Sequence, residues 1–430
     1  MKTMKQLLLA AGLVAGLAAT LAGPAFAEDE QAVIARGAYL ARAGDCVACH
    51  TAPGGKEFAG GLAIESNLGK IFSTNITPDR QSGIGGYTEA QFAAALRDGK
   101  RADGANLYPA MPYPSYAKLT DEDVHALYVY FMKGVQPVAS AAPETRLSFP
   151  FNLRFGLAFW NFAFGNSTRF QPNPQASDEI NRGAYLVEGL GHCGSCHTPR
   201  GFAMQEQGYT AADDSYLAGG DLNGWVAPSL RGATGASRGF STWTVEEIVD
   251  YLGSGRNNHA AVGGEMKMVV EHSLGYLNDA DLKAMAVYLK SIATGAPQQP
   301  PSPERARATA DRLTAAVNLS EGERLYLDNC GACHFVTGQG DARVFPKLDG
   351  NSIINASNPL ALVSTILAGA ATPSTDRSPS ILPMPGFASR LSDNEVAALA
   401  TFLRTGWSNN APAVSAGDVA AIRARMTPAH

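Results

Sequence analysis

Three stretches of the chain place apolar residues three or four positions apart behind a good helix cap, which predicts three amphipathic helices. Their caps are Thr120, Asn278 and Ser392. An acidic residue three positions after each cap lies near the positive end of the helix dipole. The apolar positions are Val124, Leu127 and Phe131; Leu282, Met285 and Leu289; and Val396, Leu399 and Leu403.

An aromatic residue falls eleven positions after the leucine that opens each of these stretches. The three aromatics are Tyr130, Tyr288 and Phe402. We expect each to pack where the first and last helices of a repeat cross.

Each capped helix closes a repeat that opens with a second shared pattern. Arg-Gly-Ala-Tyr-Leu occupies residues 36–40 and 182–186, and a degenerate version occupies residues 321–326. We interpret each as an N-terminal helix. The segments between the two helices are rich in glycine and proline and have little strand character, so the predicted fold class is all-α, with three tandem small domains.

Cys-x-x-Cys-His follows each N-terminal helix. The pattern consists of Cys46, Cys49 and His50; Cys193, Cys196 and His197; and Cys330, Cys333 and His334. This is the attachment signature of c-type haem, because two thiols one helical turn apart can add to the two porphyrin vinyl groups while the adjacent imidazole becomes the proximal iron ligand. The sequence therefore predicts three covalent haems c. The first cysteines lie 147 and 137 residues apart, which suits three successive domains.

Two other functions are compatible with paired cysteines. A structural zinc site would need two further ligands near each pair, and a thioredoxin-like redox pair gives no reason for a histidine beside it in all three copies. All 6 cysteines of the chain belong to these motifs, which favours haem attachment.

The first 27 residues are typical of a secretory signal, with Lys2 and Lys5 before an apolar run and Ala25-Phe26-Ala27 as the cleavage site. Export agrees with covalent haem attachment and places the chain in the bacterial periplasm. Removing the signal changes the net charge from −5 to −7. No basic run is present, so nucleic acid is not an expected partner, and no later segment is apolar for long enough to span a bilayer.

Two methionines occupy equivalent places before their capped helices. Met111 lies eight residues before Leu119, and Met384 lies seven before Leu391, each followed by proline. A single methionine is more often core filler. A Met-Pro repeated at the same place in a rigid turn instead indicates the distal iron ligand, which raises the potential relative to histidine.

The middle repeat offers two methionines, Met266 and Met268, and spacing alone slightly favours Met268. Four histidines are rival ligands, although each is expected to be a surface or helix residue. They are His125, His192, His259 and His272.

The order of elements resembles class I cytochrome c: an N-terminal helix, the haem motif, a loop with proline, a methionine and a C-terminal helix. In that family the proline loop helps to fix the ring of the proximal histidine. Residues 227–232 and 345–350 look like this loop, while the first repeat offers only the looser Asn75-Ile76-Thr77-Pro78.

The whole mature chain resembles the triheme cytochrome c subunit of membrane-bound bacterial dehydrogenases for alcohols, gluconate and related sugar acids or polyols. The phrases that carry the resemblance are Arg42-Ala43-Gly44-Asp45, Ser73-Thr74-Asn75-Ile76-Thr77-Pro78-Asp79, Leu107-Tyr108-Pro109-Ala110-Met111-Pro112-Tyr113, Gly191-His192-Cys193, Thr198-Pro199-Arg200-Gly201 and Met384-Pro385-Gly386-Phe387. In that family the middle methionine stands eleven residues before the last capped leucine, which favours Met266.

The resemblance implies an electron-transfer subunit without a catalytic site of its own. Its expected partners are a large catalytic dehydrogenase subunit containing FAD or pyrroloquinoline quinone (PQQ), a small third subunit, and ubiquinone at the periplasmic side of the membrane. Alternatives are a soluble shuttle to a terminal oxidase and a subunit of a molybdenum hydroxylase or aldehyde dehydrogenase. A haem peroxidase would need an open distal site, against which three His/Met sites argue.

Two connectors divide the mature chain. Residues 147–164 concentrate phenylalanine and tryptophan around Arg154, which suits either interdomain packing or a docking surface for a partner or the membrane. Residues 293–312 hold four prolines and are expected to form an extended, exposed linker. The predicted division is a signal at 1–27, domain 1 at 28–140, an aromatic connector at 141–175, domain 2 at 176–292, a linker at 293–314, domain 3 at 315–410 and a tail at 411–430.

Overall fold

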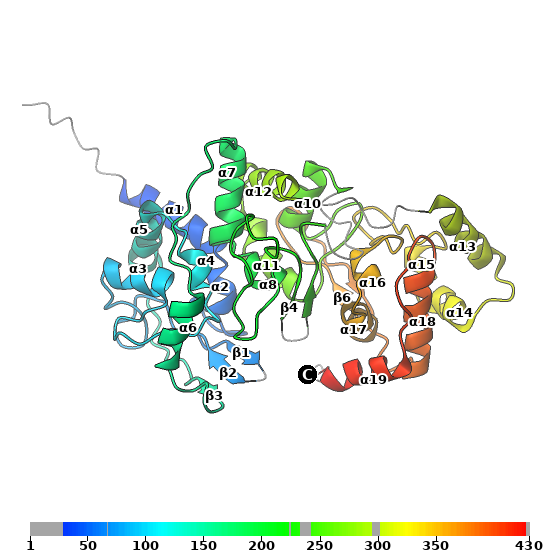
Figure 1. Cartoon of the computed structure of the whole chain (residues 1–430), viewed down its shortest axis with the longest axis horizontal. Helices are drawn as coiled ribbons and strands as arrows, with labels where there is room; N and C mark the ends of the chain where they lie inside the picture. Colours follow the sequence, from blue (N-terminus) through cyan, green and yellow to red (C-terminus); the bar gives the residue numbers. More distant parts are fainter. Residues whose placement is uncertain (1–28, 67, 223–224, 233–241, 295–301, 427–430) are drawn as a thin grey trace, which may run out of the picture.

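The computed structural model describes residues 29–66, 68–222, 225–232, 242–294 and 302–426. The predicted signal sequence lies outside the described residues, as do Pro297, Pro300 and Pro301 of the second connector. In Figure 1 domains 1 and 2 form the blue-to-green half of the molecule, and domain 3 forms the yellow-to-red half.

The chain is mainly helical, which confirms the predicted fold class. Domain 1 contains α1 Glu30–Ala43, α2 Cys46–Cys49, α3 Glu89–Asp98, α4 Tyr113–Tyr116, α5 Asp121–Val129 and the π-helix η1 Tyr130–Gly134. The aromatic connector contributes α6 Gly156–Phe164. Domain 2 contains α7 Asp178–Ala184, the π-helix η2 Tyr185–Leu190, α8 Gly194–His197, α10 Val245–Ser254, α11 Glu265–His272, the 3₁₀-helix η3 Leu274–Tyr276 and α12 Asp279–Ser291. The rest of the chain forms α13 Pro303–Ala315, α14 Glu321–Asn329, α15 Gly331–His334, α16 Ser352–Asn355, α17 Leu360–Ala368, α18 Asp393–Thr405 and α19 Ala416–Arg425.

Short antiparallel strands brace the loops of each domain. They are β1 Ala63–Ser66, β2 Gly69–Phe72, β3 Arg146–Leu147, β4 Gly220–Leu222, β5 Trp225–Ala227, β6 Ala370–Ala371 and β7 Pro383–Met384. In the three-stranded sheet β3 pairs with β2, so the aromatic connector begins as part of domain 1.

The three predicted caps are confirmed. The side chains of Thr120, Asn278 and Ser392 each accept a hydrogen bond from the backbone N–H three residues on. This contact satisfies one of the donors that a helix start leaves free.

A close helix crossing is common to all three repeats, between α1 and α5, α7 and α12, and α14 and α18. At each crossing the first helix carries a glycine, and a Cβ added there would lie within 2.4 Å of a carbonyl oxygen in the last helix. The predicted aromatic supplies its Cβ to the same contact. The pairs are Gly37 with Tyr130, Gly183 with Tyr288 and Gly322 with Phe402. This confirms the expected place of the aromatics.

Domains 1 and 2 share one hydrophobic core, whose members run from Val33 to Leu289. Domain 3 has its own core, from Leu313 to Ile422. The first two domains are therefore fused into one packed body.

Two tyrosine–aspartate hydrogen bonds, here called the tyrosine exchange, link domains 1 and 2 in both directions. The Tyr39 hydroxyl of domain 1 donates to Asp281 Oδ2 of domain 2 at 2.5 Å, and the Tyr185 hydroxyl of domain 2 donates to Asp123 Oδ2 of domain 1 at 2.5 Å. Each aspartate also accepts from the arginine of its own N-terminal helix; these arginines are Arg36 and Arg182. Each tyrosine thus bonds the start of the other domain's last helix.

Domain 3 meets domain 2 through polar contacts and a few apolar ones, such as Val226 against the domain 3 core. The Arg343 and Lys347 backbone N–H groups donate to the carbonyls of Asn257 at 3.3 Å and His259 at 3.1 Å. Arg377 pairs with Asp279 at 2.6 Å. These contacts orient domain 3 without merging its core with that of domain 2.

The extended linker expected at residues 293–312 is wrong in its described second half, which forms α13. Ser302 caps this helix and Pro303 occupies its first turn, where proline stabilises helices because its missing N–H is not needed. Leu313 is 1% exposed, and Thr309 accepts a hydrogen bond from the Trp407 backbone N–H. The helix therefore packs on domain 3.

The C-terminal tail also joins domain 3. Helix α19 contacts α17 and α18, and it buries Val419 and Ile422. Arg423 donates to the Leu391 carbonyl and pairs with Asp393 at the start of α18. The packed unit of domain 3 therefore extends beyond residue 410.

Candidate haem attachment sites

Each Cys-x-x-Cys-His motif forms a one-turn helix directly after the N-terminal helix of its domain; these turns are α2, α8 and α15. The first cysteine of each motif is half-buried, the second is exposed, and all six are unpaired thiols. One edge of each motif thus faces the domain interior while the other is open, which leaves both sulfurs free to bond a porphyrin.

The three motif histidines share one geometry. Nδ1 lies 2.7 Å from the Thr74 carbonyl oxygen in His50, 2.7 Å from that of Pro228 in His197 and 2.9 Å from that of Pro346 in His334. A carbonyl can only accept, so Nδ1 carries the proton and Nε2 keeps its lone pair for a metal. A hydrogen bond from the other ring nitrogen is typical of histidine metal ligands.

Burial lowers the pKa of each of these imidazoles, although the backbone hydrogen bond acts in the opposite direction. The rings are therefore neutral at neutral pH, as an iron ligand must be.

Two of the three acceptor carbonyls lie in the predicted proline loops, at Pro228 and Pro346. Domain 1 uses Thr74, which directly precedes the predicted Asn75-Ile76-Thr77-Pro78. Asn75 holds this loop by donating from Nδ2 to the Val138 and Ser140 carbonyls. No proline marks Thr74 in the sequence, and its only signal is its place in the Ser73-Thr74-Asn75 phrase.

The thiol environment does not suit a redox pair. Burial raises the pKa of Cys46, Cys193 and Cys330 to about 12. Thioredoxin-like and other reactive cysteines instead need a lowered pKa.

The four methionine candidates differ in burial. Met111, Met266 and Met384 are half-buried and pack against the hydrophobic cores, as does the first cysteine of their own domain. Met268 is 43% exposed.

Three of the rival histidines have other contacts. His125 pairs with Glu89, and His259 stacks on Trp243 and lies 2.8 Å from Glu247. His192 packs edge-on against Tyr116. The fourth, His272, is half-buried at the last residue of α11.

The motifs of domains 1 and 2 lie side by side. The Tyr116 hydroxyl donates to the Gly44 carbonyl before the first motif, while its ring contacts His192 before the second. The pKa of Cys49 is raised to about 11, chiefly by burial, and Asp45, Cys196 and Glu265 also contribute. Tyr116 therefore joins the segments that lead into the two motifs.

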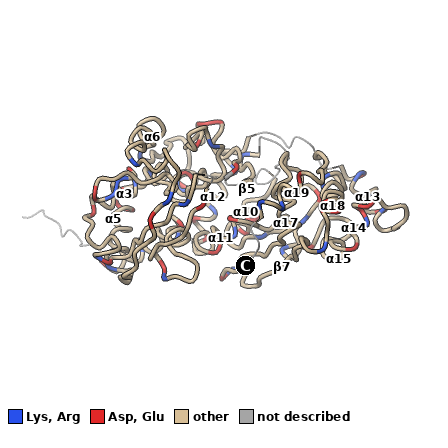
Figure 2. The backbone as a smooth tube through the Cα atoms, turned by 90° about the horizontal axis from the view of Figure 1, so that it is seen from below, with Lys and Arg blue, Asp and Glu red and all other residues tan. Residues whose placement is uncertain are grey.

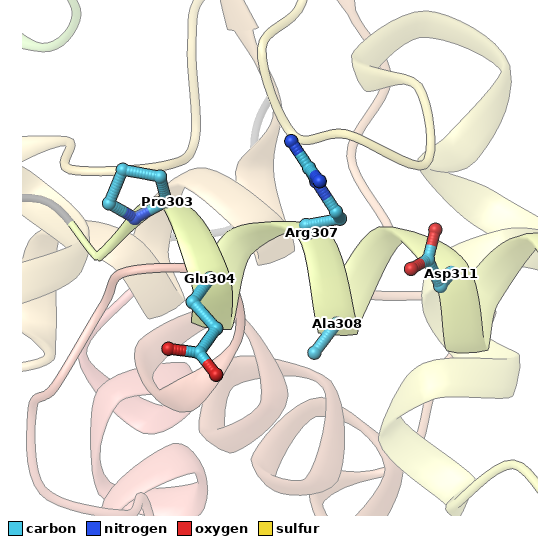
Figure 3. A pocket seen from close by; sticks show the side chains of 5 residues that line it. All are labelled: Pro303, Glu304, Arg307, Ala308 and Asp311. Carbon is cyan, nitrogen blue, oxygen red and sulfur yellow. The ribbon is translucent and has the colours of Figure 1, made fainter.

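A shallow depression of about 410 Å³ lies elsewhere, along α13. Figure 3 shows its lining side chains, all from this one helix: Pro303, Glu304, Arg307, Ala308 and Asp311. It contains none of the predicted haem-site residues.

Three such attachment motifs, each with a histidine whose Nδ1 is held by a backbone carbonyl, define a triheme c-type cytochrome. A family model described as cytochrome c matches residues 34–134 and 319–407. The chain carries three covalently attached haems c and acts as an electron-transfer subunit.

Similar proteins place the chain more narrowly. It is 45% identical over 424 residues to the cytochrome c subunit of the alcohol dehydrogenase (quinone) of Gluconobacter oxydans (strain 621H), covering 96% of this chain and 87% of that protein. It is 42% identical over 415 residues to the gluconate 2-dehydrogenase cytochrome c subunit of Pantoea cypripedii, covering 94% and 93%. It is 39% identical over 423 residues to the fructose dehydrogenase cytochrome subunit of Gluconobacter japonicus, covering 93% and 85%. The chain belongs to this family of dehydrogenase cytochrome c subunits.

Proposed function

We propose that this chain receives electrons from a large catalytic dehydrogenase subunit and delivers them to ubiquinone at the periplasmic side of the cytoplasmic membrane. The donor oxidises an alcohol with PQQ, or gluconate, fructose or a related compound with FAD, and a small third subunit completes the complex. A haem c bound at each motif supplies one-electron redox chemistry.

The observation that carries this proposal is the repeated proximal geometry. Three imidazoles, each fixed through Nδ1 to a backbone carbonyl, present Nε2 from the end of a one-turn helix. Fixed ligands keep the site from reorganising when its charge changes, which suits electron transfer. The near-complete coverage of the alcohol dehydrogenase (quinone) and gluconate 2-dehydrogenase cytochrome subunits supports the donor, and the quinone in the name of the first supports the acceptor.

For the distal ligands we propose Met111, Met266 and Met384. Half-burial in the same core as the attached cysteine supports all three, and the exposure of Met268 favours Met266 over it. The alternative contacts of His125 and His259 also disfavour these histidines.

A second candidate donor rests on another relative. Over 385 residues the chain is 42% identical to one of the subunits of the nicotinate dehydrogenase of Pseudomonas putida, covering 89% of this chain but 31% of that protein. In this alternative the chain would accept electrons from a nicotinate dehydrogenase and not from an alcohol, gluconate or fructose dehydrogenase.

Deletion and complementation test the function. Membranes from a strain that lacks the chain should lose ubiquinone reduction by one of ethanol, gluconate, fructose or nicotinate, and the complemented strain should regain it. The substrate affected identifies the donor. Loss of a soluble route to a terminal oxidase, with every quinone-linked oxidation intact, would instead favour the periplasmic shuttle.

The middle ligand is tested by paired substitutions. Met266→Leu should keep all haem attached, because Cys193, Cys196 and His197 are unchanged, yet it should remove about one third of the methionine-to-iron charge-transfer absorbance of the oxidised protein. The potential of one site should fall, since the thioether that favours ferrous iron is gone. Met268→Leu is the matched control, and the opposite result would move the ligand to Met268.

A further inference from the structure

Domains 1 and 2 together expose a group of large apolar side chains, here called the aromatic surface. Its side chains come from the aromatic connector and from the loop after the second motif. They are Phe149, 78% exposed; Phe151, 49%; Leu153, 39%; Phe155, 69%; Phe159, 73%; Phe162, 92%; Phe202, 94%; and Met204, 47%. Figure 2 shows the central helix, α6, at one edge of the molecule, and Phe164 joins the two segments through an edge-on contact with Phe202.

The aromatic surface is firmly attached. On the inner side of α6, Asn161 accepts a hydrogen bond from the Tyr113 hydroxyl at 2.6 Å, and the Trp160 indole donates to the Ala203 carbonyl at 2.8 Å. Trp160 also packs edge-on against Tyr113. The inner side of α6 therefore provides the interdomain packing expected of this connector, while its phenylalanines remain outside.

Charge is almost absent from the aromatic surface. Arg154 is the single charged residue within residues 149–164 and 202–204. Its guanidinium donates to the Asn106 carbonyl and lies 4.5 Å from the centre of the Tyr108 ring. Residues 149–164 and 202–204 therefore provide an outward face that is almost entirely apolar.

A lipid bilayer suits this face better than a protein partner. A protein interface typically forms one hydrogen bond per 100–200 Å² and surrounds its apolar centre with polar groups. The exposed phenylalanine side chains have no strong donor or acceptor, and Phe159 and Phe162, at 73% and 92% exposure, project outward from α6. Interfacial helices use such aromatic faces to enter the headgroup and acyl boundary.

We propose that the aromatic surface inserts into the outer leaflet of the membrane and holds domains 1 and 2 against it. The proposal rests on the proposed function, because ubiquinone dissolves in the bilayer and its reductant must approach it there. No helix in the described ranges is both long enough and apolar enough to cross a membrane.

The position of the aromatic surface gives this docking a functional consequence. The aromatic connector is hydrogen-bonded to the tyrosines on both sides of Met111. The Tyr108 hydroxyl donates to the Phe151 carbonyl, and the Tyr113 hydroxyl donates to Asn161. The other segment of the aromatic surface follows the second motif by a few residues, and Arg200 donates to the Ser195 carbonyl inside that motif. Electrons would therefore leave the chain through domains 1 and 2.

Flotation of the mature, haem-loaded chain with vesicles of phosphatidylcholine and phosphatidylethanolamine tests the docking. Phe159→Ser combined with Phe162→Ser should weaken binding about 10- to 100-fold, because two phenylalanines lose their apolar burial. Phe202→Ser should weaken it by about tenfold or less. The matched control is Val317→Ser with Ile381→Ser in domain 3, at 66% and 55% exposure, which should float like the wild type.

Quinone reduction separates docking from the electron-transfer function. The chemically reduced double phenylalanine variant should reduce a short-chain, water-soluble ubiquinone at the wild-type rate but should lose most of its activity toward long-chain ubiquinone in the vesicles. Failure of the wild type to float, or equal flotation of the variant, would overturn the docking. Normal flotation with loss of the copurifying dehydrogenase would assign the surface to a protein partner. A wild type that floats but reduces neither quinone would reject the proposed function and leave the docking intact.

Discussion

The same repeat builds domains 1 and 2 into one body but leaves domain 3 a separate unit. The difference lies two residues after the crossing glycine. Domains 1 and 2 have Tyr39 and Tyr185 there, and each bonds the other domain's aspartate, while domain 3 has Arg324. The corresponding acid in domain 3, Glu395, instead bonds back to its own cap, Ser392. The residue two positions after the glycine therefore distinguishes a helix start that is bonded by the neighbouring domain from one that is bonded by its own residues.

The surrounding contacts follow the same division. Between domains 1 and 2 the packed residues are apolar, and the buried Lys118 and Glu188 are paired across the interface at 3.1 Å. Between domains 2 and 3 the contacts are backbone hydrogen bonds, partly exposed ion pairs and a buried hydrogen bond from Arg256 to Ser378. Domains 1 and 2 should unfold together, and domain 3 should unfold independently.

The largest effect is expected from the helix crossings. The Cβ of Gly183→Ala would lie 2.0 Å from the Ala284 carbonyl oxygen, so the helices must separate, at a cost of about 3 kcal/mol. Calorimetry with domain-resolved hydrogen exchange should show that domains 1 and 2 are both destabilised. In Gly322→Ala, with 2.4 Å to the Ala398 oxygen, only domain 3 should be affected. A domain 1 that keeps its full protection in Gly183→Ala would contradict the fused body.

How far the sequence predicts this arrangement depends on the range of each interaction. The haem motifs and helix caps such as Thr120 can be predicted, because each forms from residues that are close together in the sequence. The tyrosine exchange is not, because Tyr39 has the same sequence pattern whether it packs in its own domain or in another. The linker prediction is wrong because proline disrupts the interior of a helix but is favourable in the first turn, where Pro303 lies. The sequence around Pro303 allows both a linker and a helix start. The burial of Leu313 against domain 3 shows that the segment is a helix. The Thr74 carbonyl escapes prediction because backbone acceptors leave no residue-type signal.

Removing one hydroxyl of the exchange should have the next largest effect. Tyr185→Phe leaves Asp123 with fewer donors and should destabilise domains 1 and 2 by roughly 1.5–3 kcal/mol, as expected for a hydrogen bond to a charged group. Tyr39→Phe should act similarly through Asp281. Denaturant unfolding measures both, with Arg324→Ala in domain 3 as the matched change. Equal losses in all three variants would show that the exchange is not what distinguishes the domains.

Lowering the pH should weaken the hydrogen bonds of the tyrosine exchange before it affects the apolar core. Burial would raise the pKa of Asp281, but the hydrogen bonds from Arg182 and Tyr39 outweigh it and hold the pKa below its usual range. A lowered folded-state pKa gives stability that is present above the unfolded value of about 3.9 and is lost as the pH falls through the folded value. Asp281→Asn should therefore flatten the acid limb of the stability curve of domains 1 and 2. An unchanged acid limb would assign it to other carboxylates.

Salt should have the smallest effect and should act at the interface between domains 2 and 3. Arg343 and Asp250 are 40% and 50% exposed, and Arg377 and Asp279 are 34% and 83% exposed, so each ion pair contributes about 0–1 kcal/mol and is screened by salt. As salt rises, the Lys347 amide, which donates to the His259 carbonyl, should exchange faster. The Thr120 amide, which donates to the Tyr185 hydroxyl inside the fused body, should not change. Arg343→Gln combined with Arg377→Gln should produce the high-salt exchange pattern at low salt. If Thr120 responded as strongly as Lys347, polar contacts would govern both interfaces, and the distinction between a fused pair and a separate third domain would fail.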